Sequence, residues 1–269
     1  MARKRSSNAF VKAAIGAAAF LLTTVAAHAD ISTFATFTSI GSAKNVSLVN
    51  SGDGATLYST STGTATGPGI AKVQFGFLQD GLSDFVSNVV ADFTLNGTIV
   101  DPATTQGSLL YQPVFSGTMT FKSTTAITLT GPLFETKTFE AGSNLLTVTF
   151  KGAIAGSRNG STANFNGSTG ADDTVLFTSD FLDFSNVTER DYANTLNAIT
   201  PRLSLGANGR LNSFRATIGG SFSSDPAPIL VGTIPEPASW SLMIIGFMML
   251  GAAVRRVRRN GDVPARLTL

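Results

Sequence analysis

The chain of 269 residues contains no cysteine and a single histidine, His28, and only 13% of its residues are charged. Without cysteine it cannot form a disulfide, a thiolate metal site or a cysteine nucleophile. His28 lies in a segment that we expect to be removed, so the mature chain is expected to lack an imidazole as well. These absences exclude a Ser-His-Asp hydrolase and a histidine-ligated metal enzyme, and no cofactor is expected. The low charge excludes a disordered polyelectrolyte.

Residues 1–29 have the order of a secretory signal peptide. Basic residues precede an apolar run over residues 13–25, and Ala27 and Ala29 follow as small residues at alternate positions. The run is shorter than the roughly 20 residues that a membrane-spanning helix needs. We therefore expect cleavage after Ala29, export across the inner membrane, and a mature chain that begins at Asp30.

A second apolar stretch, residues 240–254, begins at Trp240 and is followed at once by a cluster of four arginines: Arg255, Arg256, Arg258 and Arg259. As a helix it would be about 22 Å long at ~1.5 Å per residue, which is short for a ~30 Å hydrocarbon core. The arginine cluster predicts a cytoplasmic membrane stop, and Trp240 suits the opposite interface. Pro235 and Pro237 are expected to keep the preceding segment extended and accessible.

Pro235, Glu236, Pro237 and Trp240, the apolar stretch and the arginine cluster together resemble the C-terminal sorting signal of bacterial PEP-CTERM proteins, in the PEPxxWA variant. Ser241 stands where that variant usually has alanine after the tryptophan. The resemblance implies that residues 234–269 hold an exported precursor in the inner membrane until an exosortase cuts near Pro-Glu-Pro. It also implies a Gram-negative host that makes exopolysaccharide.

The net charge of +2 hides two oppositely charged parts of the chain. Residues 1–29 and 235–269 together carry a net charge of +7, so residues 30–234 carry −5. The overall pI near 9.0 is therefore a property of the terminal segments. A mildly acidic body does not predict a nucleic-acid partner.

Residues 30–233 are predicted to be all-β, a single antiparallel β-sandwich or jelly roll, because threonines and apolar residues alternate along them. Strands are expected at 31–37, 71–77, 90–95, 117–121, 145–150 and 214–218. Asn-Gly pairs that begin at Asn96, Asn159, Asn166 and Asn208 predict tight turns. Residues 188–198 are the one helix-like stretch, with Tyr192, Leu196 and Ile199 at helical spacing.

Phenylalanine is expected to form the core of this body, since most of the 20 phenylalanines fall on strand positions. The body has no tryptophan, and the chain has three tyrosines, which gives little support for a dedicated aromatic face that stacks on sugars.

The leading hypothesis is a non-enzymatic protein with a structural or adhesive role alongside exopolysaccharide, first anchored in the membrane and then located at the cell surface or outside it. One alternative is a secreted polysaccharide hydrolase with an Asp/Glu pair, which needs no histidine. The other is a calcium-dependent carbohydrate-binding module, for which Asp172 and Asp173 could supply oxygen ligands.

Overall fold

A computed structural model describes residues 31–61, 67–131, 134–169, 174–231, 244–245 and 247–249. The described body is all-β, as the alternating pattern predicts. Its strands are β1 (Ser32–Ser39), β2 (Val46–Asn50), β3 (Ala55–Ser59), β4 (Ala71–Phe77), β5 (Val89–Ile99), β6 (Thr104–Gln106), β7 (Leu109–Ser123), β8 (Ile127–Gly131), β9 (Phe134–Phe139), β10 (Asn144–Ser157), β11 (Ala163–Ser168), β12 (Val175–Thr178), β13 (Leu182–Asp183), β14 (Glu189–Thr200), β15 (Phe214–Asp225) and β16 (Ile229–Leu230). All six predicted strands are confirmed. Residues 244–245 and 247–249 are helical, and no described helix is long and apolar enough to cross a membrane.

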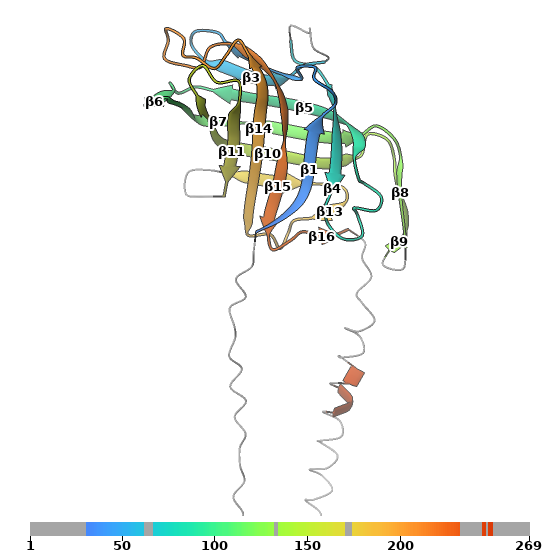
Figure 1. The fold of residues 1–269 in the computed structure, drawn as a ribbon. Coiled ribbons are helices and arrows are strands. Elements are labelled where there is room, and N and C mark those ends of the chain that lie inside the picture. The colour runs from blue at the N-terminus through green and yellow to red at the C-terminus, as the bar shows by residue number, and fades with distance from the viewer. Residues whose placement is uncertain are drawn as a thin grey trace, which may run out of the picture.

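Twelve strands form one antiparallel sheet that closes on itself. Following the pairings gives a ring in the order β1, β4, β5, β7, β10, β11, β14, β15 and back to β1, while β6 and β12 add to β7 and β10. In Figure 1, β14, β15, β1 and β4 run along one layer, and β5, β7 and β10 cross behind them. Two strand pairs, β8–β9 and β13–β16, lie outside the ring. The arrangement is sandwich-like, with the core between the two crossing layers.

The ring has a seam where two of its strands change partners. β15 pairs with β2 over Phe214–Ala216 and then with β1 over Gly220–Ser224. β5 likewise changes from β4 to β3 along its length. Side chains replace the missing ladder bonds: Asn45 Oδ1 accepts the Ile218 N–H at 3.0 Å, and Ser59 Oγ accepts the Leu95 N–H at 3.0 Å. The seam therefore separates the β1–β4 pair from the β2–β3 pair without leaving these two backbone donors unsatisfied.

Phenylalanine does form the core. Phe121 lies at its centre, with ring centroids of Phe37, Phe75, Phe93 and Phe222 between 4.8 and 5.6 Å away. The other buried phenylalanines are Phe34, Phe77, Phe115, Phe139, Phe150, Phe165, Phe177, Phe181, Phe184 and Phe214. Aromatic rings of this size bury enough apolar area to account for a stable core without disulfides.

The helix predicted over residues 188–198 is wrong, because this stretch lies in strand β14. Tyr192 and Leu196 are buried at even spacing on a strand, and a spacing of four fits a strand as well as a helix. The next buried residue, Ile199, comes three positions later because the register shifts between Asn197 and Thr200. Ala198 has a φ of 52° there. The bulge thus produced a spacing that resembles helical periodicity.

Two of the four predicted Asn-Gly turns are confirmed and two are wrong. Asn159 has a φ of 60° in the connection from β10 to β11, and Gly209 has a φ of 74° between β14 and β15. The Asn96 pair lies inside β5, and the Asn166 pair lies inside β11. In both strands an aromatic ring covers the glycine: a Cβ on Gly97 would be 2.3 Å from the Phe115 ring, and one on Gly167 would be 2.6 Å from the Tyr192 ring. These glycines make room for core rings.

Candidate functional site

The residues predicted from the terminal segments lie outside the described residues, and so do the calcium candidates. They are Ala27, Ala29, Asp172, Asp173, Pro235, Glu236, Pro237, Trp240, Arg255, Arg256, Arg258 and Arg259. Part of the apolar stretch is described: Ile244, Ile245, Phe247, Met248 and Met249 each have at least half of their surface exposed. These five apolar side chains are therefore not buried in the body.

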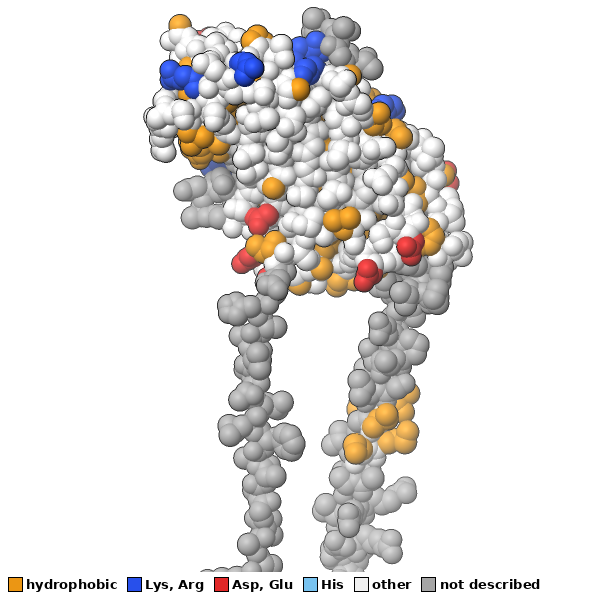
Figure 2. Space-filling model, viewed as in Figure 1, with side chains coloured by type: hydrophobic (Ala, Val, Ile, Leu, Met, Phe, Trp, Pro, Cys, Tyr) orange, Lys and Arg blue, Asp and Glu red, His pale blue; other side chains and the backbone are white. Residues whose placement is uncertain are grey.

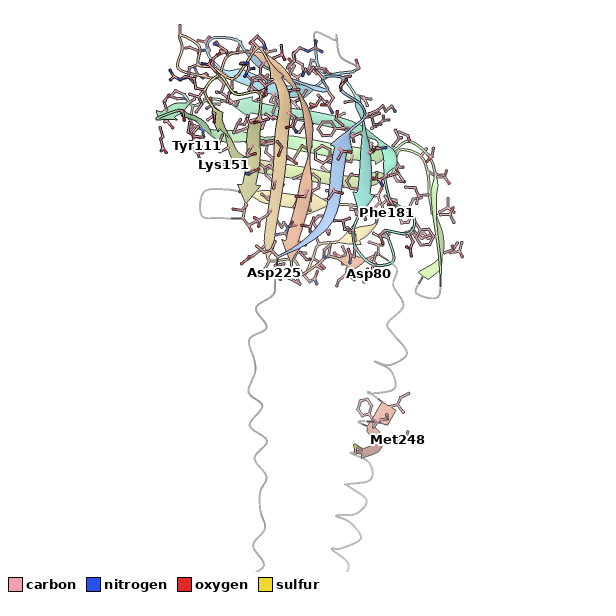
Figure 3. All side chains as sticks on the ribbon, in the orientation of Figure 1. Asp80, Tyr111, Lys151, Phe181, Asp225 and Met248 are labelled. Atoms are coloured by element: carbon pink, nitrogen blue, oxygen red, sulfur yellow. The ribbon has the colours of Figure 1, made fainter. Side chains whose placement is uncertain are left out.

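The described body begins and ends at one end of the molecule. Ser32 at the start of β1 pairs with Ser224, and the Val231 N–H donates to Phe181 O at 3.0 Å. Figure 1 shows the start of β1 beside β13 and β16 at this end. Figure 3 places Asp80 and Asp225 there too. Any segments that continue the chain at Ile31 and at Val231 thus leave from the same end.

Five carboxylates lie at this end, which we call the acidic end: Asp80 and Asp225, labelled in Figure 3, and Asp180, Asp183 and Glu189, placed by their strand pairings and by the contact of Phe181 with Val231. Glu189 is the cross-strand neighbour of Asp225, and Asp183 lies in β13, which pairs with β16. On the face in Figure 2 the Asp and Glu side chains lie mainly at the lower end, whereas Lys and Arg side chains lie in a row along the upper end. On this face the two signs of charge are therefore separated along the length of the body.

Connections between strands meet at the opposite end, which we call the loop end, and hydrogen bonds join them. Arg210 donates to Gly52 O at 3.1 Å and to Val100 O, so it joins three loops. The Arg158 N–H donates to Ser108 O at 2.7 Å, and Arg202 Nη1 donates to Asn159 O at 3.0 Å. These contacts join the loops of this end to one another, and they position the side chains of Arg202 and Arg210.

A pocket of about 170 Å³, the seam pocket, opens where β1 ends and β4 begins. Its lining residues are Ser39, Ile40, Ala43, Lys44, Asn45, Ile70, Ala71 and Lys72. Asn45 is 6% exposed, its Oδ1 accepts the Ile218 N–H, and its Nδ2 is a buried donor without a partner among the described residues. Ser39 Oγ is also buried, and no described residue forms a hydrogen bond with it. The seam pocket combines apolar walls with two lysines.

Two further hollows on the described surface each contain one carboxylate. Asp191 lines the first, with Asn166, Ser168 and Tyr192, and Asp183 lines the second, beside Arg190. A hydrolase of the kind considered above needs two carboxyl groups about 5–10 Å apart across one cleft, and neither hollow has a second carboxylate in its lining. Among the described residues, no three His, Cys, Asp or Glu side chains are grouped so as to hold a metal ion.

Burial raises the pKa of the Asp191 carboxyl above its usual value of 3.8. The folded state therefore binds this proton more tightly than the unfolded state, and stability falls as the pH rises from about 3.8 through the folded pKa. We expect Asp191→Asn to raise the free energy of unfolding at pH 7 and to lose this advantage below pH 3.8. Urea unfolding at the two pH values measures the effect. Asp84→Asn, at an exposed carboxyl, is the control, and an equal gain there would contradict the assignment.

Sequence reasoning missed the seam pocket and the row of basic side chains beside it. Lys44 lies in the connection from β1 to β2, Lys72 lies in strand β4, and Arg158 and Arg202 lie far along the chain. No run of basic residues marks them, because only the strand pairings bring them to one end. A local signal for the seam pocket was present at Asn45, a polar residue directly before the alternating apolar residues of β2.

Comparison of the chain with protein-family models, with curated proteins and with solved structures finds no match in any of the three. Function is therefore inferred from the terminal segments and from the geometry of the body.

Proposed function

We propose that this protein is exported, held briefly in the inner membrane by residues 240–254, and sorted by an exosortase to the cell envelope or extracellular matrix. There its body has a structural or adhesive role alongside exopolysaccharide. The observation on which this rests is the order of three parts near the C-terminus: Pro-Glu-Pro at 235–237, the apolar stretch, and the arginine cluster at 255–259. Each part has a separate physical role in presenting a cleavage site at a membrane surface.

The position of the chain ends supports this proposal. The described body ends at Val231, four residues before Pro235, and this point lies at the acidic end. A membrane tether that follows it directs the acidic end toward the membrane and the loop end away from it. The loop end is then the part of a tethered precursor that meets molecules outside the cell.

The construction of the body also supports a structural role. Every strand of the ring is paired on both sides over at least part of its length, which leaves few unpaired backbone edges. The core consists of packed aromatic rings. A body of this kind stays folded outside the cell without disulfides, whose absence follows from the cysteine-free sequence.

Mass spectrometry of the protein recovered outside the cell tests the two processing steps together. We expect the recovered chain to begin at Asp30 and to lack residues 240–254. Replacing both Ala27 and Ala29 with leucine is expected to retain residues 1–29, because cleavage requires small residues at these two positions. His28→Gln changes the residue between them and is expected to leave cleavage unaltered. Recovery of a chain that starts at Met1 would overturn the export step.

A further inference from the structure

Four basic residues lie across the loop end in the order Lys72, Lys44, Arg202 and Arg158, and each is related to the next by a shared pocket lining or by a contact to the neighbouring backbone. Lys72 and Lys44 both line the seam pocket. Lys44 Nζ donates to Ala198 O, four residues before Arg202. Arg202 then donates to Asn159 O, next to Arg158. Figure 2 shows Lys and Arg side chains lined up along this end. We call these four residues the cationic row.

Few carboxylates oppose the row. Asp92 forms an ion pair with Lys72, and Asp53 and Asp101 lie in neighbouring loops, where they adjoin the carbonyls of Gly52 and Val100 that Arg210 binds. The acidic end lies at the other end of the body. A polyanion is therefore repelled from one end and attracted to the other, which orients its approach.

The seam pocket adds a feature that a plain charged surface lacks. Ile40 and Ile70 line it and have 42% and 53% of their surfaces exposed, and Lys44 and Lys72 lie beside them. Ser39 Oγ and Asn45 Nδ2 of the same lining are buried and have no hydrogen-bond partner among the described residues. The site thus offers an apolar surface and positive charge together.

We propose that the cationic row binds an extended anionic polysaccharide, with a sugar carboxylate at the seam pocket. The apolar C–H face of a uronic acid ring fits against the two isoleucines while its carboxylate lies toward Lys44, because Lys72 is already paired with Asp92. Nucleic acid is a poorer fit, because single strands are held by stacking on aromatic side chains and the residues of the row and pocket include no aromatic ring. The choice of a polysaccharide rests on the proposed function, whereas the location of the site does not.

Binding of a polyuronate, alginate, to the full-length chain in neutral detergent tests this proposal. We expect affinity that falls with added salt, and no binding of neutral dextran. Replacing Lys44 and Arg202 together with glutamine is expected to lower alginate affinity about tenfold at low salt. Lys137→Gln with Lys151→Gln makes the same charge change away from the row and is expected to lower it less than about twofold. The charge-preserving pair Lys44→Arg with Arg202→Lys is expected to bind like the original.

Three outcomes would overturn the proposal: equal losses in the two glutamine pairs, full affinity in the Lys44/Arg202 pair, or no salt-dependent binding at all. Tighter binding of single-stranded DNA than of alginate through the same two residues would also overturn it, by making the partner a nucleic acid. Thermal unfolding of each variant checks that the body is intact. A failure of processing in the host would overturn the proposed function and would leave these binding results standing.

Discussion

Replacing Gly117 with alanine is expected to cost the body about 3 kcal/mol or more of folding free energy. Gly117 on β7 lies directly opposite Gly97 on β5. A Cβ on Gly117 would lie 2.2 Å from Asn96 O and 2.5 Å from the Gly97 Cα. Both atoms belong to the backbone, so no side-chain rotation relieves the contact. The two strands would have to separate where the layers close over the Phe115 ring.

Urea unfolding monitored by circular dichroism measures this loss. Gly67→Ala is the matched control, because a Cβ there meets nothing within 4 Å, and we expect it to change the free energy of unfolding by less than about 0.5 kcal/mol. If Gly117→Ala and Gly67→Ala have the same unfolding midpoint, the close approach of β5 and β7 is not as described.

The strands were predictable because the relevant signal is local. Val148 and Phe150 alternate with Thr147 and Thr149, and the structure buries the first pair. Alternation of this kind requires only neighbours along one strand, since successive side chains point to opposite faces. It also led to the correct expectation that the phenylalanines form the core.

The seam was not predictable, because it depends on contacts between distant parts of the chain. Asn45 satisfies the Ile218 N–H across a separation of 173 residues. The positions of Gly97 in β5 and Gly167 in β11 were also not predictable from neighbouring residues alone. An Asn-Gly pair carries a local turn preference, and what overrides it at Gly97 and Gly167 is an aromatic ring from another strand. The cationic row was not predictable for the same reason, because its four residues come to one end of the body only when the strands of the ring pair.

Changing Pro235, Glu236 and Pro237 to alanine is expected to block release of the protein from the inner membrane. Two prolines within three residues cannot continue a helix or a central strand, so they are expected to keep this segment free between the body and the apolar stretch. Alanine removes both the extended geometry and the single carboxylate. The body is expected to fold normally, because its described core contacts lie before residue 232.

Ser239→Ala is the matched control, because it changes a position between Pro237 and Trp240 that the sorting pattern leaves open. Both variants keep Trp240 and the arginine cluster, which set the depth and orientation of the apolar stretch. Any difference between the two variants therefore comes from the Pro-Glu-Pro segment.

Pulse-chase labelling in the native host, followed by fractionation of inner membrane and medium, tests sorting most directly. The account predicts that the wild type and Ser239→Ala leave the membrane in shortened form, while the triple-alanine variant accumulates there with residues 240–254 still attached. Shortening and release of the triple-alanine variant at the wild-type rate would contradict it, and the C-terminal segment would then act as a plain membrane anchor.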